Sequence, residues 1–215
     1  MIHPHTALRW VDDTIGYGVF ATRPIPRGTI VWVRDPLDQP FTAEEAAKLP
    51  PLSREMLARY NYVNRHGEML LCWDHGRYVN HACRASCTTA GWEFEIAVRD
   101  LEPGDELTDE YGTFSFDEPF SCACGAPDCR RTIYPDDVLR LVEVWDRRFA
   151  ETFAYMPRVD QPLWSLVDEN EKAEVELARA GKLAIPSCRV HVRDEYILRY
   201  HRRSVAEPAA AQAAM

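Results

Sequence analysis

Two features are missing from this 215-residue sequence, a long apolar run and a secretory signal, and each absence argues against a class of protein. No run of 18 apolar residues occurs, so no segment is predicted to span a membrane. The N-terminus lacks a basic region followed by an apolar stretch, which argues against a secretory signal and for an intracellular protein. Such a protein would be cytoplasmic in a bacterium and either cytoplasmic or nuclear in a eukaryote.

Positive charge is also in short supply. The chain has 25 Lys and Arg against 34 Asp and Glu, a net charge of −9, which argues against direct binding of nucleic acid. Residues 1–135 carry a net −7 (13 basic, 20 acidic) and residues 136–215 a net −2 (12 basic, 14 acidic). An acidic surface suits a basic protein or peptide substrate. The alternative is that the charge only keeps the protein soluble.

Local patterns predict a mainly β region followed by helices. Short segments of β-branched or alternating apolar residues, bounded by turn residues, predict strands near 6–10, 17–21, 29–33, 68–73 and 92–98. In the last of these, the alternation places Glu95 on the polar face of a half-buried strand. A capping box formed by Thr42 and Glu45 predicts a short helix, and a second is expected at 54–60. Beyond Pro135, apolar residues at helical spacing predict helices near 138–153, 170–180 and 191–203.

The seven cysteines are unevenly distributed, and three of them, Cys122, Cys124 and Cys129, lie on one short loop. In a reducing compartment, clustered thiols are more typical of metal ligands than of disulfides. A closed structural zinc site needs four tetrahedral ligands, so a fourth ligand has to come from elsewhere in the chain.

Four short segments follow one another in a fixed order along the chain: Gly16-Tyr17-Gly18, Arg77-Tyr78-Val79-Asn80-His81-Ala82-Cys83, Glu106-Leu107-Thr108-Asp109-Glu110-Tyr111-Gly112, and the loop with Cys122, Cys124 and Cys129. Each is weak by itself. Together they resemble the SET-domain protein-lysine N-methyltransferases that carry a post-SET cysteine motif. The resemblance covers roughly residues 6–135.

The resemblance implies a mainly β fold of several small sheets with a pseudoknot, here followed by a helical C-terminal extension. The expected organisation is a SET domain at 1–120, a post-SET zinc loop at 121–135, a helical extension at 136–205 and a disordered tail at 206–215. In the pseudoknot, the segment that contains Glu106 passes beneath the one that contains Asn80.

The resemblance also implies a site for S-adenosylmethionine. The family's Gly-x-Gly holds the methionine part of this cofactor, and the corresponding residues here are Gly16, Tyr17 and Gly18. Other residues expected at the cofactor are Arg77, Asn80 and His81, the last mainly through its backbone. Asn offers both a donor and an acceptor, which suits the amino acid end of the cofactor. Two departures from the family pattern are Ala82 in place of Ser, and Ala85-Ser86 in place of Pro-Asn.

Tyr111 aligns with the family's catalytic tyrosine. Methyl transfer to an amine needs a neutral lysine, whereas free lysine has a pKa of about 10.4. A narrow apolar channel lowers that pKa, and a tyrosine hydroxyl at its inner end can orient the amine. Residues expected to line the channel are Tyr78, Asp109, Phe114 and Phe116, whereas Trp73 is expected in the core. Asp109 stands where the family has Phe or Tyr, whose size helps decide how many methyl groups fit. An Asp at this position can leave room in the channel, admit water or attract the lysine cation.

By the same resemblance, Cys83 is the fourth zinc ligand beside Cys122, Cys124 and Cys129, and Cys87 is a competitor for that place. The predicted function is S-adenosylmethionine-dependent methyl transfer to lysine in a protein substrate. Two alternatives stay open: a SET-fold binding module without catalysis, and a zinc-stabilised interaction protein without a cofactor.

Overall fold

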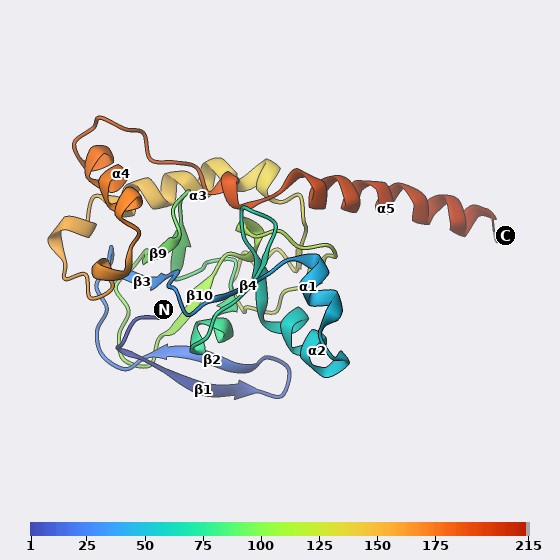
Figure 1. Cartoon of the computed structure of the whole chain (residues 1–215), viewed down its shortest axis with the longest axis horizontal. Coiled ribbons are helices and arrows are strands. Elements are labelled where there is room, and N and C mark those ends of the chain that lie inside the picture. Colours follow the sequence, from blue (N-terminus) through green and yellow to red (C-terminus); the bar gives the residue numbers. More distant parts are fainter. Residues whose placement is uncertain (214–215) are drawn as a thin grey trace.

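A computed structural model describes the backbone of residues 1–213 and the side chains of residues 1–203. Within these limits the strands form four small sheets, and most of the helices follow them in the sequence (Figure 1), which confirms the expected mainly β plan with a helical extension. No helix of the described residues is both long enough and apolar enough to cross a membrane.

The first sheet carries three of the sequence motifs. Its strand order is β1 (Thr6–Asp12), β2 (Gly16–Ala21), β10 (Glu106–Asp109) and β7 (Asn80–His81). The turn between β1 and β2 forms because the Asp12 carboxylate accepts the N–H groups of Thr14 and Ile15, both at 2.8 Å. Strand β10 pairs antiparallel with β2 and parallel with β7. The parallel pairing places the Asn80 and Glu106 segments side by side.

The second sheet has the order β3 (Ile30–Val33), β9 (Phe94–Ala97) and β8 (Cys87–Thr89). All four residues of β9 are buried, so the half-buried strand predicted from its alternation is wrong. Phe94 and Ile96 pack into a core shared with Phe149 and Val175 of the C-terminal helices. The opposite face is covered as well, by a second core that contains Ala97.

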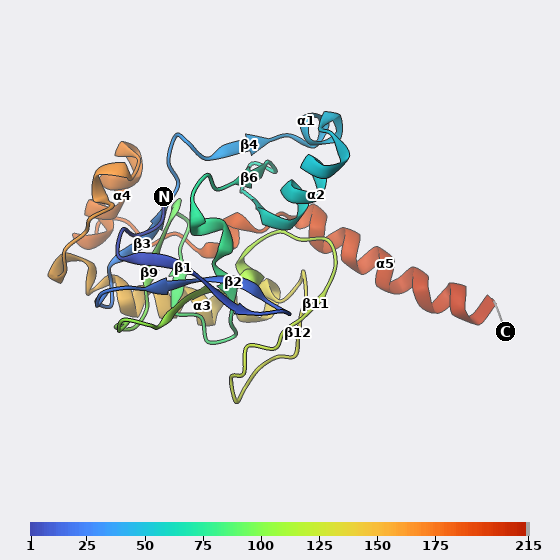
Figure 2. The same cartoon turned by 90° about the horizontal axis from the view of Figure 1, so that it is seen from below.

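A third sheet and two short helices lie on one side of the molecule (Figure 2). The sheet has the order β4 (Gln39–Phe41), β6 (Met69–Leu71) and β5 (Asn61–Val63), and the helices are α1 (Ala43–Lys48) and α2 (Pro51–Tyr60). The predicted capping box at Thr42 and Glu45 is present at the start of α1. A fourth, two-stranded sheet, β11 (Phe120–Ser121) and β12 (Thr132–Ile133), forms the base of the cysteine loop.

The C-terminal extension contains α3 (Val138–Phe153), α4 (Glu169–Arg179) and α5 (Asp194–Ala213). Short 3₁₀ turns connect the elements of the chain: His75–Tyr78, Tyr111–Thr113, Met156–Arg158, Trp164–Leu166 and Cys188–His191. Helix α4 ends before Gly181, whose φ of 68° fits the predicted glycine stop.

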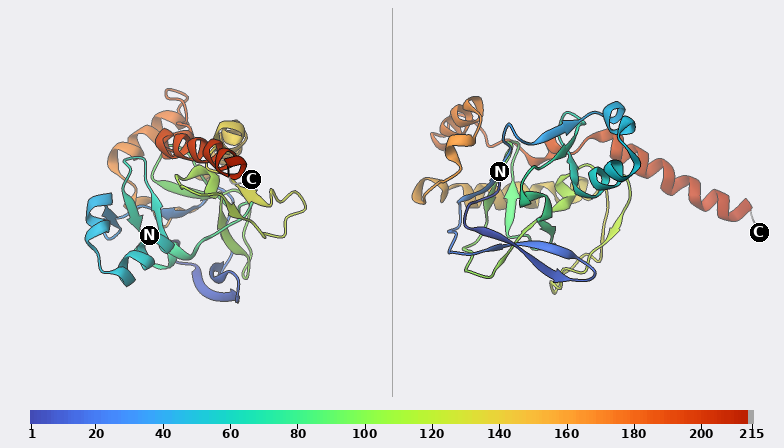
Figure 3. Two further views of the ribbon diagram at one scale, coloured as in Figure 1. Left: turned by 90° about the vertical axis from the view of Figure 1, so that its right-hand side faces the viewer. Right: turned by 60° about the horizontal axis from the view of Figure 1, so that its bottom comes forward.

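Helix α5 projects away from the rest of the molecule (Figure 3). It runs to Ala213, so the tail predicted to be disordered from residue 206 is helical as far as the described residues reach. Residues 214–215 lie outside that range. The first half of α5 is fixed to the segment after Tyr111, because Arg199 forms a 2.8 Å ion pair with Asp117 and Arg203 pairs with Glu118.

The extension is joined to the β region through Gln161. Its side-chain oxygen accepts the N–H of Ile30 at 2.8 Å, and its side-chain nitrogen donates to the carbonyl of Gly28 at 2.8 Å. On the same strand, the N–H of His3 donates to Val31 O at 2.7 Å, and the N–H of Val33 donates to Met1 O at 3.0 Å.

Candidate functional site

Two cavities meet at Tyr111. The first, of about 440 Å³, lies between the β1–β2 turn, the end of α2 and the 3₁₀ turn His75–Tyr78. The second, of about 280 Å³, is lined largely by aromatic side chains and reaches the buried strand β9. Tyr111 lines both, together with Arg59, Tyr60, Arg77 and Val79. Two adjoining cavities with a shared wall suit two ligands that must meet.

The first cavity collects most of the residues predicted to hold the cofactor. Gly16, Tyr17, Arg77 and Asn80 line it, whereas Gly18 and His81 do not. Gly18 is nevertheless required for the local packing. A Cβ at this position would lie 2.5 Å from Glu106 Oε1 and 3.0 Å from Asn80 Nδ2. Gly16 has a φ of 86°, a conformation that side chains other than glycine rarely adopt.

Asn80 holds three segments of the first sheet together. Its side-chain nitrogen donates to Tyr17 O at 3.0 Å and to Glu106 Oε1 at 2.8 Å. The amide therefore fixes the Gly-x-Gly backbone against β7 and β10 before any ligand binds. Aromatic rings complete this wall. The ring of Tyr17 lies 5.2 Å from that of Trp10 and 5.8 Å from that of Tyr78.

The ring of His81 faces the interior. Its Nδ1 accepts the N–H of Tyr111 at 3.1 Å, and its Nε2 lies 3.6 Å from Cys83 Sγ. Burial, assisted by the nearby Arg130 guanidinium, lowers the pKa of His81 to about 4, so the imidazole is neutral at physiological pH. The side chain thus links the Tyr111 backbone to the cysteine cluster.

The Tyr111 hydroxyl donates a 2.6 Å hydrogen bond to Val79 O. Burial raises the pKa of this phenol far above its usual value, with further contributions from Asp109, Glu95 and Glu106. The hydroxyl therefore stays protonated at neutral pH and acts as a fixed hydrogen-bonding group, not as a base.

Three of the four predicted channel residues, Asp109, Phe114 and Phe116, line the second cavity. Tyr78 lines only the first cavity, where its ring lies 5.0 Å from that of Tyr60. The assignment of Trp73 to the core is wrong. This side chain is 43% exposed, and its indole N–H donates to the buried Asp35 carboxylate at 3.0 Å.

The second cavity contains an acidic residue, Glu95, that was not predicted from the sequence. Glu95 of β9 and Asp109 of β10 both line it and lie within hydrogen-bonding reach of one another. Burial raises the pKa of Asp109 to about 6, although contacts with Glu95, the Glu110 N–H and Arg148 oppose the shift. Burial and the Asp109 charge raise the pKa of Glu95 as well.

The four cysteines Cys83, Cys122, Cys124 and Cys129 lie together, with every pair of sulfur atoms within 4.8 Å. The Cys83 and Cys122 sulfurs are 3.8 Å apart. A zinc tetrahedron with Zn–S bonds of about 2.3 Å has edges of about 3.8 Å, so the cluster fits a zinc ion. Backbone N–H groups of Arg130 and Arg131 donate to Cys83 and Cys129 at 3.4 Å, as expected for thiolate ligands.

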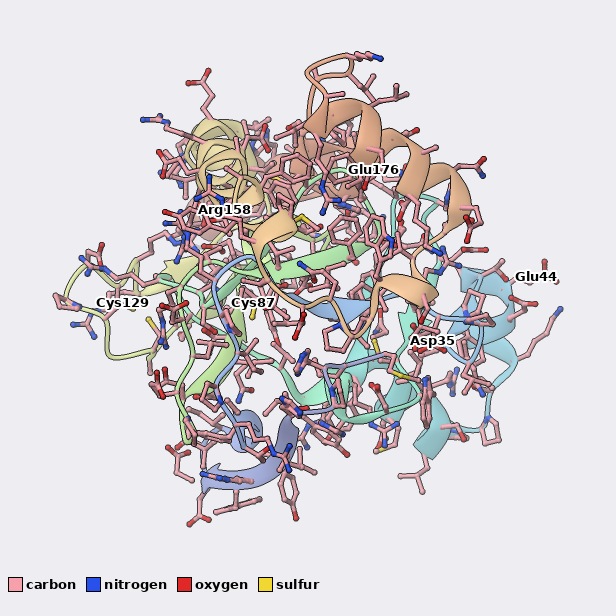
Figure 4. All side chains as sticks on the ribbon, turned by 90° about the vertical axis from the view of Figure 1, so that its left-hand side faces the viewer. Asp35, Glu44, Cys87, Cys129, Arg158 and Glu176 are labelled. Atoms are coloured by element: carbon pink, nitrogen blue, oxygen red, sulfur yellow. The ribbon has the colours of Figure 1, made fainter. Side chains whose placement is uncertain are left out.

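Cys87, the competing fourth ligand, lies elsewhere. It is 1% exposed and packs in the core with Val19 and Ile25. Figure 4 labels Cys129 on an outer loop and Cys87 in the interior.

Burial would raise the pKa of Cys124, but hydrogen bonds from its neighbours lower it to about 7, which provides a thiolate near neutral pH.

Arg130 fixes the cysteine loop to the body of the protein. Its guanidinium contacts both Glu110 oxygens, at 2.5 and 2.6 Å, and Asp137 Oδ2 at 2.9 Å. The two carboxylates are 6% and 1% exposed, so this is a buried network. It connects the residue before Tyr111, the cysteine loop and the start of α3.

The family model for the SET domain matches residues 16–112. Residues 16–112 belong to the SET-domain family. The chain is similar to the histone-lysine N-methyltransferase ATX2 of Arabidopsis thaliana, with 31% identity over 139 residues, which cover 55% of the chain. It is also similar to the histone-lysine N-methyltransferase trr of Drosophila melanogaster, with 38% identity over 64 residues and 26% coverage. These matches span only 12% and 3% of the respective relatives.

Among solved structures, the SET domain resembles KRYPTONITE, crystallised in complex with mCHG DNA and SAH. The identity is 20%, the TM-score is 0.40, and the match covers 57% of this chain and 28% of the other.

Several residues at the site had no distinctive sequence pattern. Besides Glu95, they are the cavity-lining residues Arg59, Tyr60, Tyr62 and His191. Tyr60 and Tyr62 stand at the end of α2 and in β5, where the sequence alone suggests ordinary packing.

Proposed function

We propose that this chain transfers the methyl group of S-adenosylmethionine to the side-chain amine of a lysine in a basic protein substrate. The observation that carries the proposal is the position of Tyr111 in the wall shared by the two cavities. The motifs of the SET domain supply the residues around it, and the relatives named histone-lysine N-methyltransferases support the choice of lysine.

In this proposal the first cavity receives the cofactor. Gly16 and Tyr17 offer backbone close to the ligand, and Arg77 and Asn80 offer polar groups at the same wall. Gly18 lets the strands approach closely enough for Asn80 to be fixed. When bound, S-adenosylmethionine supplies an electrophilic methyl group on a sulfonium sulfur.

The second cavity receives the lysine side chain. Tyr62, Phe114, Phe116 and Phe120 give it an aromatic lining, which excludes water and favours the neutral amine. The fixed Tyr111 hydroxyl orients the amine at the shared wall, and alignment of the reacting atoms supplies much of the rate increase. Zinc held by the four cysteines would be structural, and it would fix the loop that carries Phe120.

The first test is calorimetric titration of the zinc-loaded protein with S-adenosylmethionine, for the wild type and for Asn80→Ala. We expect binding by the wild type and at least tenfold weaker binding by the variant. The second test follows transfer of a radiolabelled methyl group to core histones, with methyllysine identified after complete hydrolysis. Exposed Asp13→Asn in the β1–β2 turn serves as a charge control for the first cavity.

The outcomes separate the alternatives. Cofactor binding without transfer to histones or to a lysine peptide library would favour a binding module. No thermal shift with the cofactor, but strong destabilisation by a chelator, would favour a zinc-stabilised interaction protein.

A further inference from the structure

Two carboxyl groups, Glu95 and Asp109, line the second cavity, and neither forms an ion pair with a side chain among residues 1–203. Glu95 is 9% and Asp109 2% exposed, and they come from β9 and β10. Each is within hydrogen-bonding reach of the other. Repulsion between two neighbouring buried carboxylates opposes ionisation of both, so we expect the pair to retain one proton and a single negative charge at neutral pH.

The surroundings do not neutralise that charge by direct contact. Asp109 Oδ1 accepts the N–H of Glu110 at 2.7 Å. Around the pair stand the Cys72 thiol, the Cys87 thiol of β8, the Glu110 carboxylate, the Tyr111 phenol and, from α3, Arg148. The N-terminal ammonium also acts on Glu95 through its field. The Arg148 guanidinium donates to Ala85 O at 2.5 Å and acts on Asp109 through its field. The buried charge therefore favours a cation that enters the cavity.

Three of the other acid–base groups of this cavity are already engaged. Glu93 forms a 2.9 Å ion pair with Arg65, and His191 Nε2 lies 2.6 Å from Ala90 O. The Tyr111 hydroxyl is committed as a donor to Val79 O. Arg59 and Arg77 also line the cavity, and the Tyr62 hydroxyl has no hydrogen-bond partner among the described residues, but burial raises the pKa of this phenol, so it stays protonated. A lysine enters as an ammonium ion with a pKa of about 10.4 in water, so it must lose a proton before it can accept a methyl group.

We propose that the Glu95–Asp109 pair accepts this proton from the substrate. The inference rests on the proposed lysine methyltransferase function. One N–H bond of the ammonium breaks, its electrons stay on nitrogen as a lone pair, and the proton moves to a carboxylate oxygen of the pair. The substrate changes from +1 to 0 and the pair from −1 to 0. Removal of water by the bound substrate favours both neutral forms over the ion pair.

This assignment limits each encounter to one methyl group. After transfer, the nitrogen is again cationic and the pair already holds both of its protons. A second transfer needs another deprotonation, but the substrate closes the cavity to water. Release of the substrate lets the pair lose its extra proton to solvent, so successive methyl groups would be added in separate encounters.

The test compares single-turnover methyl transfer to a lysine peptide between pH 5.5 and 9.5 for the wild type, Asp109→Asn and Glu95→Gln. Asp105→Asn is the control; this carboxyl is half-buried, lies directly before the same strand and pairs with Arg99 outside the cavity. We expect the wild-type and control rates to level off above about pH 7. The Asp109→Asn rate should keep rising about tenfold per pH unit and lie at least 100-fold below the wild type at pH 7.

A second readout needs neither cofactor nor turnover. Infrared difference spectra of the free protein at pH 7 should show a protonated carboxyl band that is absent in Glu95→Gln and present in Asp105→Asn. Cofactor affinity measured by calorimetry should be unchanged in all variants that fold.

Parallel pH profiles for the wild type and Asp109→Asn would overturn the inference and leave the proposed function standing. A wild-type rate that rises tenfold per pH unit up to pH 9.5 would also overturn the inference, and this result needs no variant. Absence of the protonated carboxyl band from the wild-type spectrum would overturn it as well. No methyl transfer by the wild type to any lysine peptide would instead overturn the proposed function, and the inference with it.

Discussion

The backbone N–H of Tyr111 donates a 3.1 Å hydrogen bond to Nδ1 of His81. The opposite ring nitrogen of His81 lies 3.6 Å from the sulfur of Cys83. The proposed catalytic residue and the metal cluster are therefore connected through one neutral imidazole. We therefore expect any change that moves the cysteine loop to displace Tyr111 in the wall between the two cavities.

Tyr111→Phe should reduce methyl transfer about 100-fold or more, because the hydroxyl that orients the amine is lost. It also removes one hydrogen bond to Val79, which should lower the free energy of unfolding by about 1 kcal/mol. Calorimetry should show cofactor affinity close to that of the wild type. Tyr196→Phe, on α5, is the control. Unchanged single-turnover rates in Tyr111→Phe would show that the tyrosine is misassigned.

Metal content should distinguish the two cysteines that compete in the sequence for the fourth ligand position. Cys83→Ser should lose bound zinc, measured by mass spectrometry of the metal, and should unfold at lower temperature, because one of four ligands is removed. Cys87→Ala should keep one zinc per chain, since this thiol lies in the apolar core. Equal zinc loss in both variants would contradict the ligand set.

Arg130→Met should destabilise the protein by about 3–5 kcal/mol, because it leaves the buried Glu110 and Asp137 carboxylates without their partner. Urea unfolding measures the loss. Arg84→Met, next to Cys83 in the sequence, is the matched control. Its ion pair with Asp128 is more than half exposed, so we expect no measurable change in the unfolding midpoint. Similar effects of the two variants would argue against a buried network.

Acid should weaken the fold through His3. Burial, with a smaller contribution from His5, lowers the pKa of His3 to about 4 from the ordinary 6.5. The folded state therefore favours neutral His3. Its contribution to stability is complete above pH 6.5 and is lost as the pH falls towards 4, where the unfolded chain binds the proton more readily.

His3→Asn keeps an acceptor for the His5 N–H but does not titrate. The difference between its urea midpoints at pH 7.5 and pH 5 should be smaller than in the wild type. His66→Asn, on a partly exposed turn, should retain the wild-type difference. A wild-type difference in His3→Asn would assign the acid sensitivity to other groups.

Local motifs made much of this protein predictable. The capping box at Thr42 and the glycine stop at Gly181 act over a few residues, so sequence spacing is sufficient to find them. The cysteine loop is equally local, and its spacing led to the prediction of a distant fourth ligand; the structure places Cys83 beside the three cysteines of the loop.

Features that depend on distant packing were missed. The alternation in β9 predicted one apolar face. The burial of the other face, which carries Glu95, depends on a second core built from distant segments and could not be predicted from this strand. The meeting of Glu95 and Asp109 follows from strands in two different sheets, and no pattern within either strand encodes it. Trp73 was wrongly assigned to the core because its large apolar ring suggested burial, whereas only its N–H reaches a buried group, the Asp35 carboxylate.

Gln161 and the first three residues together cover the side of β3 that does not face β9. An uncovered strand edge would present free N–H and C=O groups to the edges of other chains. Here the backbone of residues 1–3 pairs with Val31 and Val33 as a strand would, and Gln161 of the helical extension binds the Ile30 N–H and the Gly28 carbonyl. One role of the extension is thus to keep this sheet from recruiting strands from neighbouring molecules, independently of any chemistry at Tyr111.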